Sequence, residues 1–188
     1  MAEHFGIAAG AVGIAAAFTA CVDCFQYVQF GRHFGRDFQT DLLSLDCAKL
    51  RLTRWGQAVN ILNDPQLGRP DATSAEIQTV KTSLLQIIAL FEDTEKVSKK
   101  YTLDVKAEND LSILSTSDMD PAVSSLTTRM KALANKRQQG SSISKRASWA
   151  LYHRSELGEL ITNISSLIDN VESCSLHRKL SSSSSSKK

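Results

Sequence analysis

The sequence predicts an all-α fold, a single-domain helical bundle of about six to nine helices. Three observations predict it. Apolar residues recur three and four positions apart over long stretches, no stretch alternates convincingly between apolar and polar side chains, and caps and breakers divide the chain into helix-sized segments. We therefore expect one domain over residues 1–176, large enough to bury its own core, and a disordered Ser- and Lys-rich tail over residues 177–188.

The first expected helix carries one apolar stripe with four- and three-residue spacing. Its members are Ile7, Ala11, Ile14, Phe18, Cys21, Phe25 and Val28. This helix can run toward Phe30, because Gly31 can end it there.

The second expected helix has the clearest amphipathic pattern in the chain. Its apolar positions are Phe38, Leu45, Leu52 and Val59 at intervals of seven, with Ala48, Trp55 and Leu62 beside them. The opposite, solvent-facing side carries Asp41, Lys49, Arg51 and Arg54. Two prolines and a glycine in residues 63–70 end this helix.

Capping signals place the remaining helices. Residues 73–76 have the spacing of a capping box, which opens a third helix that reaches about Tyr101. Residues 102–117 form a short helix or a loop, and Asp120 before Pro121 opens a fourth helix that ends near residue 140. We expect a fifth, short helix over residues 143–151 and a sixth that follows a Ser155 cap.

Composition argues against several classes of function. A net charge of +2 is too small to indicate nucleic acid as the main partner. The four histidines are scattered, and no phosphate-loop, dinucleotide or hydrolase motif occurs, so we expect no enzyme, no cofactor and no metal site. Cys21 and Cys24 have the CxxC spacing without a second ligand pair, which favours buried helix thiols. Asp120 is explained as a cap rather than as a metal ligand.

The segment from Phe5 to Val22 is uncharged and eighteen residues long, at the lower edge of what spans a bilayer as a helix. Its six large apolar side chains contribute roughly −2 to −4 kcal/mol to insertion, and Asp23 at the bilayer centre would cost roughly 2.5 to 3.5 kcal/mol. In a membrane Asp23 would thus lie at an interface, pair with a partner or line a pore. The preceding residues lack a basic region, so we expect the segment to belong to the mature protein.

Small residues in this segment suit close packing in either environment. Gly6 and Gly10 form a GxxxG pair, and Ala9 with Gly13 repeats the spacing. The same surface would pack well inside a soluble bundle, so the residues alone leave both locations open and favour the buried core helix. Basic clusters are compatible with an anionic lipid surface or, more simply, with solvated helix faces. They are Lys49-Arg51-Arg54, Lys131-Lys136-Arg137 and Lys145-Arg146.

Several segments together resemble the fungal HeLo domain, named after the heterokaryon-incompatibility s/S proteins and a loss-of-pathogenicity protein. They lie in residues 5–11, 21–29, 31–37, 48–56 and 147–152. The similarity is dense over residues 5–62, looser to about residue 176 and absent in the tail.

The resemblance implies an all-helical, dimerising domain. In toxic members an activating signal releases the N-terminal helix, which inserts into the plasma membrane, oligomerises and permeabilises the cell. Carried to this chain, the inserting positions are Phe5, Gly6, Ile7, Gly10, Val12, Gly13, Ile14, Phe18 and Val22. The adjoining switch-region candidates are Asp23, His33 and Arg36. A histidine at position 33, with its near-neutral pKa, could bias release, but the residues favour an ordinary surface histidine.

The resemblance also defines the expected partners. The incompatibility proteins continue into an Asn- and Gly-rich prion-forming region, whereas this sequence ends in serines, as expected for the loss-of-pathogenicity member. We expect a cytoplasmic homodimer with conditional plasma-membrane association, contact with anionic lipids, a prion-domain or receptor-type activator not encoded in this chain, and a link to incompatibility-type cell death or pathogenicity. The alternative is a soluble dimeric interaction or regulatory module whose N-terminal helix stays buried.

Overall fold

The computed structural model describes residues 13–31, 38–104, 111–137 and 148–176, and the statements below concern these residues. The helices are α1 (Ile14–Tyr27), α2 (Phe38–Ala58), α3 (Ser74–Asp104), α4 (Pro121–Arg137) and α5 (Arg154–Leu176), with a 3-10 turn, η2 (Thr116–Asp118). Two short strands, β1 (Val28–Phe30) and β2 (Trp149–Leu151), complete the described elements. The predicted all-α bundle is confirmed, although the five α-helices of the described part are fewer than the six to nine expected.

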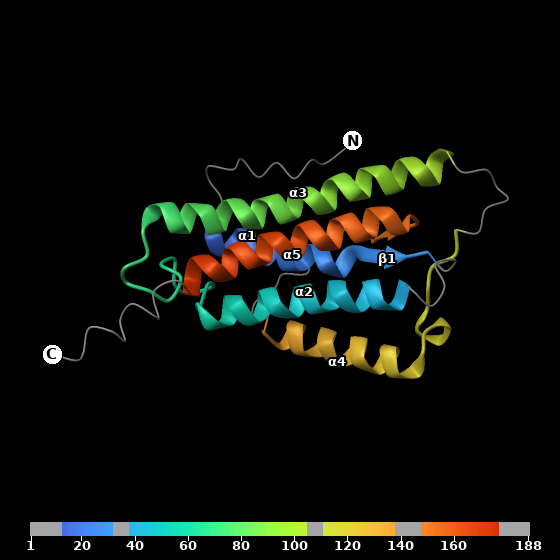
Figure 1. Cartoon of the computed structure of the whole chain (residues 1–188), viewed down its shortest axis with the longest axis horizontal. Coiled ribbons are helices and arrows are strands. Elements are labelled where there is room, and N and C mark those ends of the chain that lie inside the picture. Colours follow the sequence, from blue (N-terminus) through green and yellow to red (C-terminus); the bar gives the residue numbers. More distant parts are fainter. Residues whose placement is uncertain (1–12, 32–37, 105–110, 138–147, 177–188) are drawn as a thin grey trace.

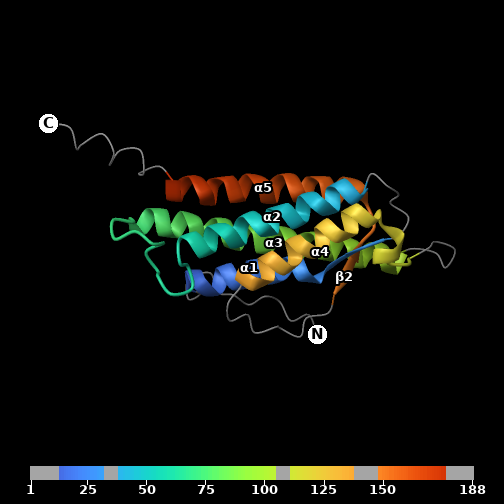
Figure 2. The same cartoon turned by 90° about the horizontal axis from the view of Figure 1, so that it is seen from below.

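The helices lie side by side along the long axis of the molecule (Figure 1). The contacts of α3 are mainly with α5 and α1, and those of α2 are mainly with α4 and α5. Seen from below, α5 forms one side of the molecule and α1 the other, and α4 runs obliquely across the front (Figure 2). The core therefore lies between α1, α2, α3 and α5, and α4 packs outside it on α2.

Two predicted helix starts are confirmed at atomic detail. The Thr73 backbone N–H donates to Glu76 Oε2 at 2.7 Å, and the Glu76 N–H donates to Thr73 Oγ1 at 3.2 Å, so the capping box before α3 is formed. The Ala122 N–H donates to Asp120 Oδ1 at 2.8 Å, which makes Asp120 the expected cap of α4.

The expectation that the chain contains no sheet was wrong in one small region. Residues 28–30, expected at the end of the first helix, form β1, and residues 149–151, expected in a fifth helix, form β2. The two strands pair in parallel, with Val28 opposite Trp149 and Phe30 opposite Leu151. Three residues are too few for an alternating pattern to be recognised, and the pairing partner lies far along the sequence.

The beginning of the last helix also differs from its expected position. The helix begins at Arg154, so Ser155 lies in its first turn instead of capping it. The rest of the expected fifth helix, and the end of the fourth beyond Arg137, lie outside the described residues.

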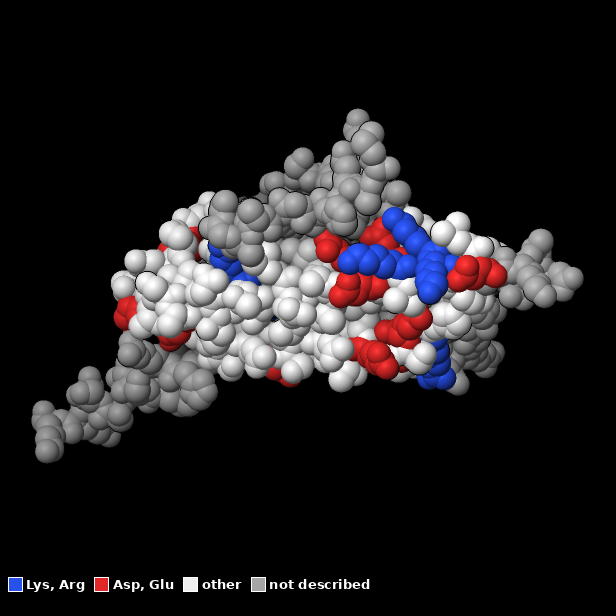
Figure 3. Space-filling model, turned by 90° about the horizontal axis from the view of Figure 1, so that it is seen from above, with Lys and Arg blue, Asp and Glu red and all other residues white. Residues whose placement is uncertain are grey.

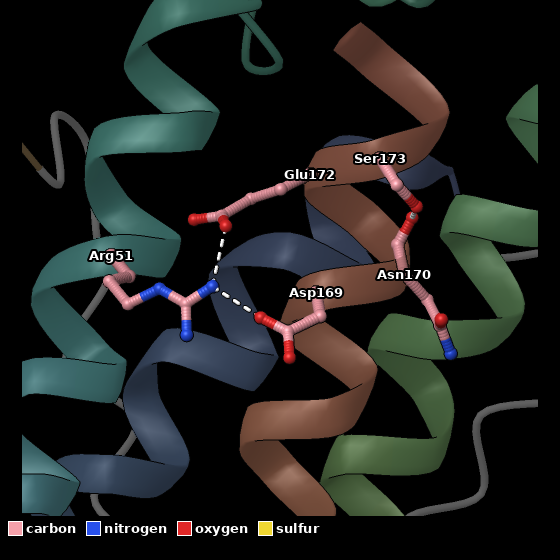
Figure 4. A network of polar contacts seen from close by, with 5 residues as sticks. All are labelled: Arg51, Asp169, Asn170, Glu172 and Ser173. Carbon is pink, nitrogen blue, oxygen red and sulfur yellow. Dashed lines mark hydrogen bonds and ion pairs between the residues drawn. The ribbon is translucent and has the colours of Figure 1, made fainter. Parts of the chain in front are cut away.

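A polar network on the surface joins α2 to α5 (Figure 4). Arg51 Nη2 lies 2.6 Å from Asp169 Oδ1 and 2.5 Å from Glu172 Oε2. These acids lie three residues apart, on one face of α5, and therefore reach the same guanidinium group. The two hydrogen bonds raise the pKa of Arg51 further, so the group stays charged.

Candidate functional site

The part of the predicted inserting segment that the structure describes is docked in the bundle. Ile14, Phe18 and Val22 are buried in the apolar core, with 7%, 2% and 0% of their surface exposed, and the predicted stripe continues through Cys21 and Phe25. Gly13 precedes α1 as an exposed N-cap residue, and a Cβ at this position would touch nothing within 4 Å. The remaining positions of the segment, Phe5, Gly6, Ile7, Gly10 and Val12, lie outside the described residues.

Phe18 is the anchor of α1 on α2. Its ring centroid lies 6.2 Å from that of Trp55, and the ring sits where a side chain at Gly56 would be, because a Cβ there would come within 2.3 Å of Phe18 Cζ. Glycine at this position lets α1 approach the α2 backbone closely. Phe18 also lines a small cavity of about 90 Å³ together with Gly56, Gln57, Asn60, Ile61, Leu62, Asn63 and Arg137.

The C-terminal end of α1 is fixed by aromatic contacts and by the sheet. Phe25 meets Phe91 of α3 edge to face, with ring centroids 4.9 Å apart. In β1, Phe30 packs in the same way on Phe38 of α2 at 4.7 Å. Such pairs add about 0.5–1.5 kcal/mol each beyond their burial, so these contacts stabilise the end of α1 and the strand that follows it.

The two cysteines of α1 are buried thiols, as the sequence predicts. Burial raises the pKa of Cys21 well above its ordinary value, and the neighbouring Cys24 adds to the increase. The thiolate is therefore disfavoured, which argues against a reactive or metal-binding role in the docked state.

Asp23 is the one charged residue of α1, and only 9% of it is exposed. It lies near the buried Lys49 of α2, whose exposed fraction is 4%. Burial lowers the pKa of Lys49, the nearby Asp46 and Asp23 raise it, and Lys131 lowers it. The ammonium group donates a hydrogen bond to Asn135 Oδ1 of α4 at 3.0 Å.

The prediction that Lys49 faces solvent was therefore wrong. The helix α2 buries a second stripe, which α1 and α4 cover, besides its apolar one. This stripe consists of Leu42, Asp46, Lys49, Thr53 and Gly56. The signal was present as small and polar residues at helical spacing, but a hydrophobic pattern alone cannot distinguish such a face from a solvated one.

Burial at this interface disfavours the charged form of Asp46. It is 8% exposed, and burial raises its pKa, although Lys131, the Thr127 hydroxyl and Lys49 act in the opposite direction. Neither Asp46 Oδ2 nor Thr127 Oγ1 makes a hydrogen bond of normal geometry. The contact between α2 and α4 is therefore polar and incompletely paired.

The basic clusters do not assemble into one described surface. Arg51 is paired with acids on α5, and Arg137 donates to Gln57 Oε1 at 3.2 Å. Seen from above, basic and acidic side chains are intermixed toward one end of the molecule (Figure 3). On α3, for example, Lys99 Nζ lies 2.7 Å from Glu95 Oε1. His33, Arg36 and the Lys145-Arg146 pair lie outside the described residues.

In the described ranges, no three His, Cys, Asp or Glu side chains form a group that could hold a metal ion. None of the helices there combines the length and the apolar character needed to cross a membrane.

Comparison with known proteins identifies the family. The profile of the HeLo family, described as prion-inhibition and propagation, matches residues 6–184. The chain belongs to the HeLo family. This HeLo chain is 41% identical over 172 residues to the heterokaryon incompatibility proteins S and s of Podospora anserina, an alignment that covers 92% of the chain and 59% of each relative. It therefore spans about three fifths of the length of these curated relatives.

Solved structures share the HeLo fold. The HET-s N-terminal domain matches with a TM-score of 0.79 at 38% identity, over 87% of this chain and 76% of that chain. A double variant of the same domain matches with a TM-score of 0.80 at 37% identity, over 89% of this chain and 79% of that chain. The resemblance inferred from the sequence motifs is thereby confirmed.

Proposed function

We propose that this HeLo chain is a non-enzymatic, latent membrane-acting domain of the incompatibility type, in which the N-terminal helix is stored in the bundle and inserts into a membrane after activation. Kinship to heterokaryon incompatibility proteins supports a role in cell death of this kind. The observation that carries the proposal is the way α1 is docked, because its buried face packs on α3 and α2, whereas α5 contacts the same two helices directly. Departure of α1 therefore leaves the contacts of α5 with α3 and α2 in place.

Length supports insertion of a longer segment than α1 itself. The fourteen residues of α1 span about 21 Å as a helix, which is less than the roughly 30 Å of a bilayer core. Helical continuation from Phe5 to Tyr27 would reach about 34 Å. The segment then carries the six large apolar side chains of residues 5–22, with Asp23 close to one interface.

The docked contacts explain why the activity would be latent. Leaving the bundle removes Phe18, Val22 and Phe25 from the core and separates Asp23 from Lys49, and each buried apolar side chain contributes roughly 1.5–3 kcal/mol. Insertion repays only a few kcal/mol by itself. An activating partner, self-association or anionic lipid must supply the remainder.

The proposal includes a location and partners. The chain is cytoplasmic at rest, as a homodimer, and associates with the plasma membrane as an oligomer once a prion-domain or receptor-type partner activates it. Anionic lipids of the inner leaflet attract its basic residues. The process served is cell death of the incompatibility type, and the proposal extends to a role in fungal pathogenicity.

Vesicle leakage tests the proposal. The purified chain, with and without residues 1–22, is added to vesicles that contain anionic lipids, and release of a trapped dye is followed under mildly destabilising conditions. We expect leakage by the full chain and none by the shortened one. Absence of both binding and leakage by the full chain under every condition would show the membrane mechanism to be wrong.

The second candidate function is a soluble dimeric interaction or regulatory module in which α1 is permanent core. The near-complete burial of Phe18 and Val22 favours it. It predicts that Ile14→Asp or Gly10→Leu unfolds the domain as a whole, without a separable loss of membrane activity. Equilibrium unfolding of these variants beside vesicle binding distinguishes the two functions.

A further inference from the structure

The helix α4 is attached to the bundle differently from the other helices. Its buried residues are Thr127, Met130 and Ala134, and none of them belongs to the continuous apolar core of the described part. Its principal contact is with α2, and it lies on the outside of the molecule in both views (Figures 1 and 2). Its docking therefore depends on few apolar side chains.

Apart from these few apolar side chains, much of the contact between α4 and the rest of the bundle is made by polar groups. Lys49 donates to Asn135, Arg137 donates to Gln57, and the Asp120 backbone N–H donates to Gln39 Oε1 at 3.1 Å. Asp46 Oδ2 and Thr127 Oγ1 stay without a hydrogen bond of normal geometry inside the contact. Detachment of α4 would hydrate these groups, which offsets part of the contacts it loses.

The same groups connect α4 to α1 through α2. Lys49 donates a hydrogen bond to Asn135 on α4 and is close enough to Asp23 on α1 for their charges to interact, and all but 4% of its own surface is buried. At the other end of the contact, Arg137 and Phe18 line the same 90 Å³ cavity. Phe18 of α1 thus shares a cavity with the C-terminal end of α4, and Asp23 of α1 is connected to Asn135 of α4 through Lys49.

From this arrangement we propose that α4 is an autoinhibitory latch: while docked, it keeps Lys49 buried beside Asp23 and so holds α1 in the bundle, and its detachment is the step that permits α1 to leave. Once α4 leaves, water reaches Lys49 and screens its attraction to Asp23. Detachment of α4 would regulate the proposed membrane activity. The structural claim that α4 holds α1 in the bundle stands by itself, whereas its consequence for cell death rests on the proposed function.

Hydrogen exchange of the full chain, followed by mass spectrometry, tests the latch. Asn135→Ala removes the partner of Lys49, and Lys136→Ala, one residue on and exposed, is its control. Met130→Asp places a carboxylate in the buried contact of α4 with α2, where Met130 meets Cys47, and Leu133→Asp makes the same change where the side chain is 47% exposed. Asn135→Ala and Met130→Asp weaken the docking of α4 by different means, so the result does not depend on one variant.

We expect amides of residues 17–25 in α1 to exchange roughly tenfold faster in Asn135→Ala and Met130→Asp, the size of effect that loss of a hydrogen bond to a charged group produces. Amides of residues 84–91 in α3 and 157–168 in α5, and both control variants, should change less than about twofold. Unchanged exchange in α1 overturns the proposal. An equal acceleration in α1, α3 and α5 also overturns it, because α4 then acts only on global stability.

Dye release from anionic vesicles by the same variants separates the latch from the proposed function. Faster exchange of α1 without leakage supports the latch and contradicts the membrane mechanism. Leakage that increases while exchange of α1 is unchanged overturns the latch and supports the membrane mechanism.

Discussion

At the scale of single residues, the docking of α1 depends on one close approach. Gly56 leaves room for the Phe18 ring, and an added Cβ would lie 2.3 Å from Cζ. The ring also packs on Trp55 and lines the small cavity beside Gly56. The fit of α1 is therefore sensitive to a single methyl group.

We expect Gly56→Ala to lower the free energy of unfolding by about 1–3 kcal/mol, the usual cost of overpacking a core. Gly158→Ala on α5 is the matched control, since a Cβ there meets nothing within 4 Å, and it should be neutral or stabilise by about 0.5–1 kcal/mol through helix propensity. Urea denaturation measures both. Equal effects at the two positions would contradict the importance of the Phe18 contact.

A second residue-scale prediction concerns pH. Because burial raises the pKa of Asp46 above its ordinary value of 3.8, the folded chain holds this proton more tightly than the unfolded chain. Stability conferred by the neutral carboxyl group is thus complete below pH 3.8 and is lost as the pH rises from there through the folded pKa. Asp46→Asn has no such proton to lose.

The free energy of unfolding of Asp46→Asn, relative to that of the unchanged chain, should therefore increase between about pH 4 and neutral pH. Any change in stability that the substitution causes at every pH does not affect this slope. Thermal or urea unfolding across this range checks the slope. Asp93→Asn on the exposed side of α3 supplies the comparison for a solvated carboxylate. A difference that falls with increasing pH would show that Asp46 is stabilised as an anion.

At the scale of elements, local sequence patterns located the helices and missed the contacts between distant segments. The apolar stripes of α2 and α3 and the caps at Thr73 and Asp120 are local signals, so they could be predicted. The pairing of β1 with β2 and the burial of Lys49 depend on which element lies opposite. No pattern within one segment contains that information.

The polar network that joins Arg51 of α2 to Asp169 and Glu172 of α5 is such a nonlocal contact. The exposure of its side chains predicts how much it contributes to stability. Arg51 is 37% exposed at the side chain, so water screens its pairs with Asp169 and Glu172. Arg51→Ala should cost about 0.5–1 kcal/mol and the cost should shrink at high salt, as measured by urea denaturation. Arg54→Ala, exposed on the same helix, should change stability by less than about 0.5 kcal/mol.

At the scale of the whole molecule, α1, α2, α3 and α5 share one apolar core, and α4 packs outside it. The helix α5 contacts α3 and α2, α1 packs on the same two helices, and α4 packs on α2. The candidate site is thus a docked element instead of a pocket with reactive groups. The sequence identified its apolar face, but the polar contacts that hold it became visible only in the assembled bundle.

Native cysteines report whether α1 leaves this assembly. Cys21 and Cys24 are buried in α1, Cys47 is exposed on α2, and Cys174 is partly exposed on α5. Without lipid we expect a maleimide to label Cys21 at least about 100-fold more slowly than Cys47, because labelling requires a local opening that costs about 3 kcal/mol or more.

Anionic vesicles should accelerate labelling of Cys21 and Cys24 while the rate at Cys174 stays within about twofold, and zwitterionic vesicles should have no such effect. Peptide mapping of the labelled chain measures all four sites in one sample. Labelling of Cys21 as fast as Cys47 without lipid would contradict the docked helix. A parallel increase at Cys174 would indicate general unfolding on the membrane, since selective release of α1 exposes only its own two thiols.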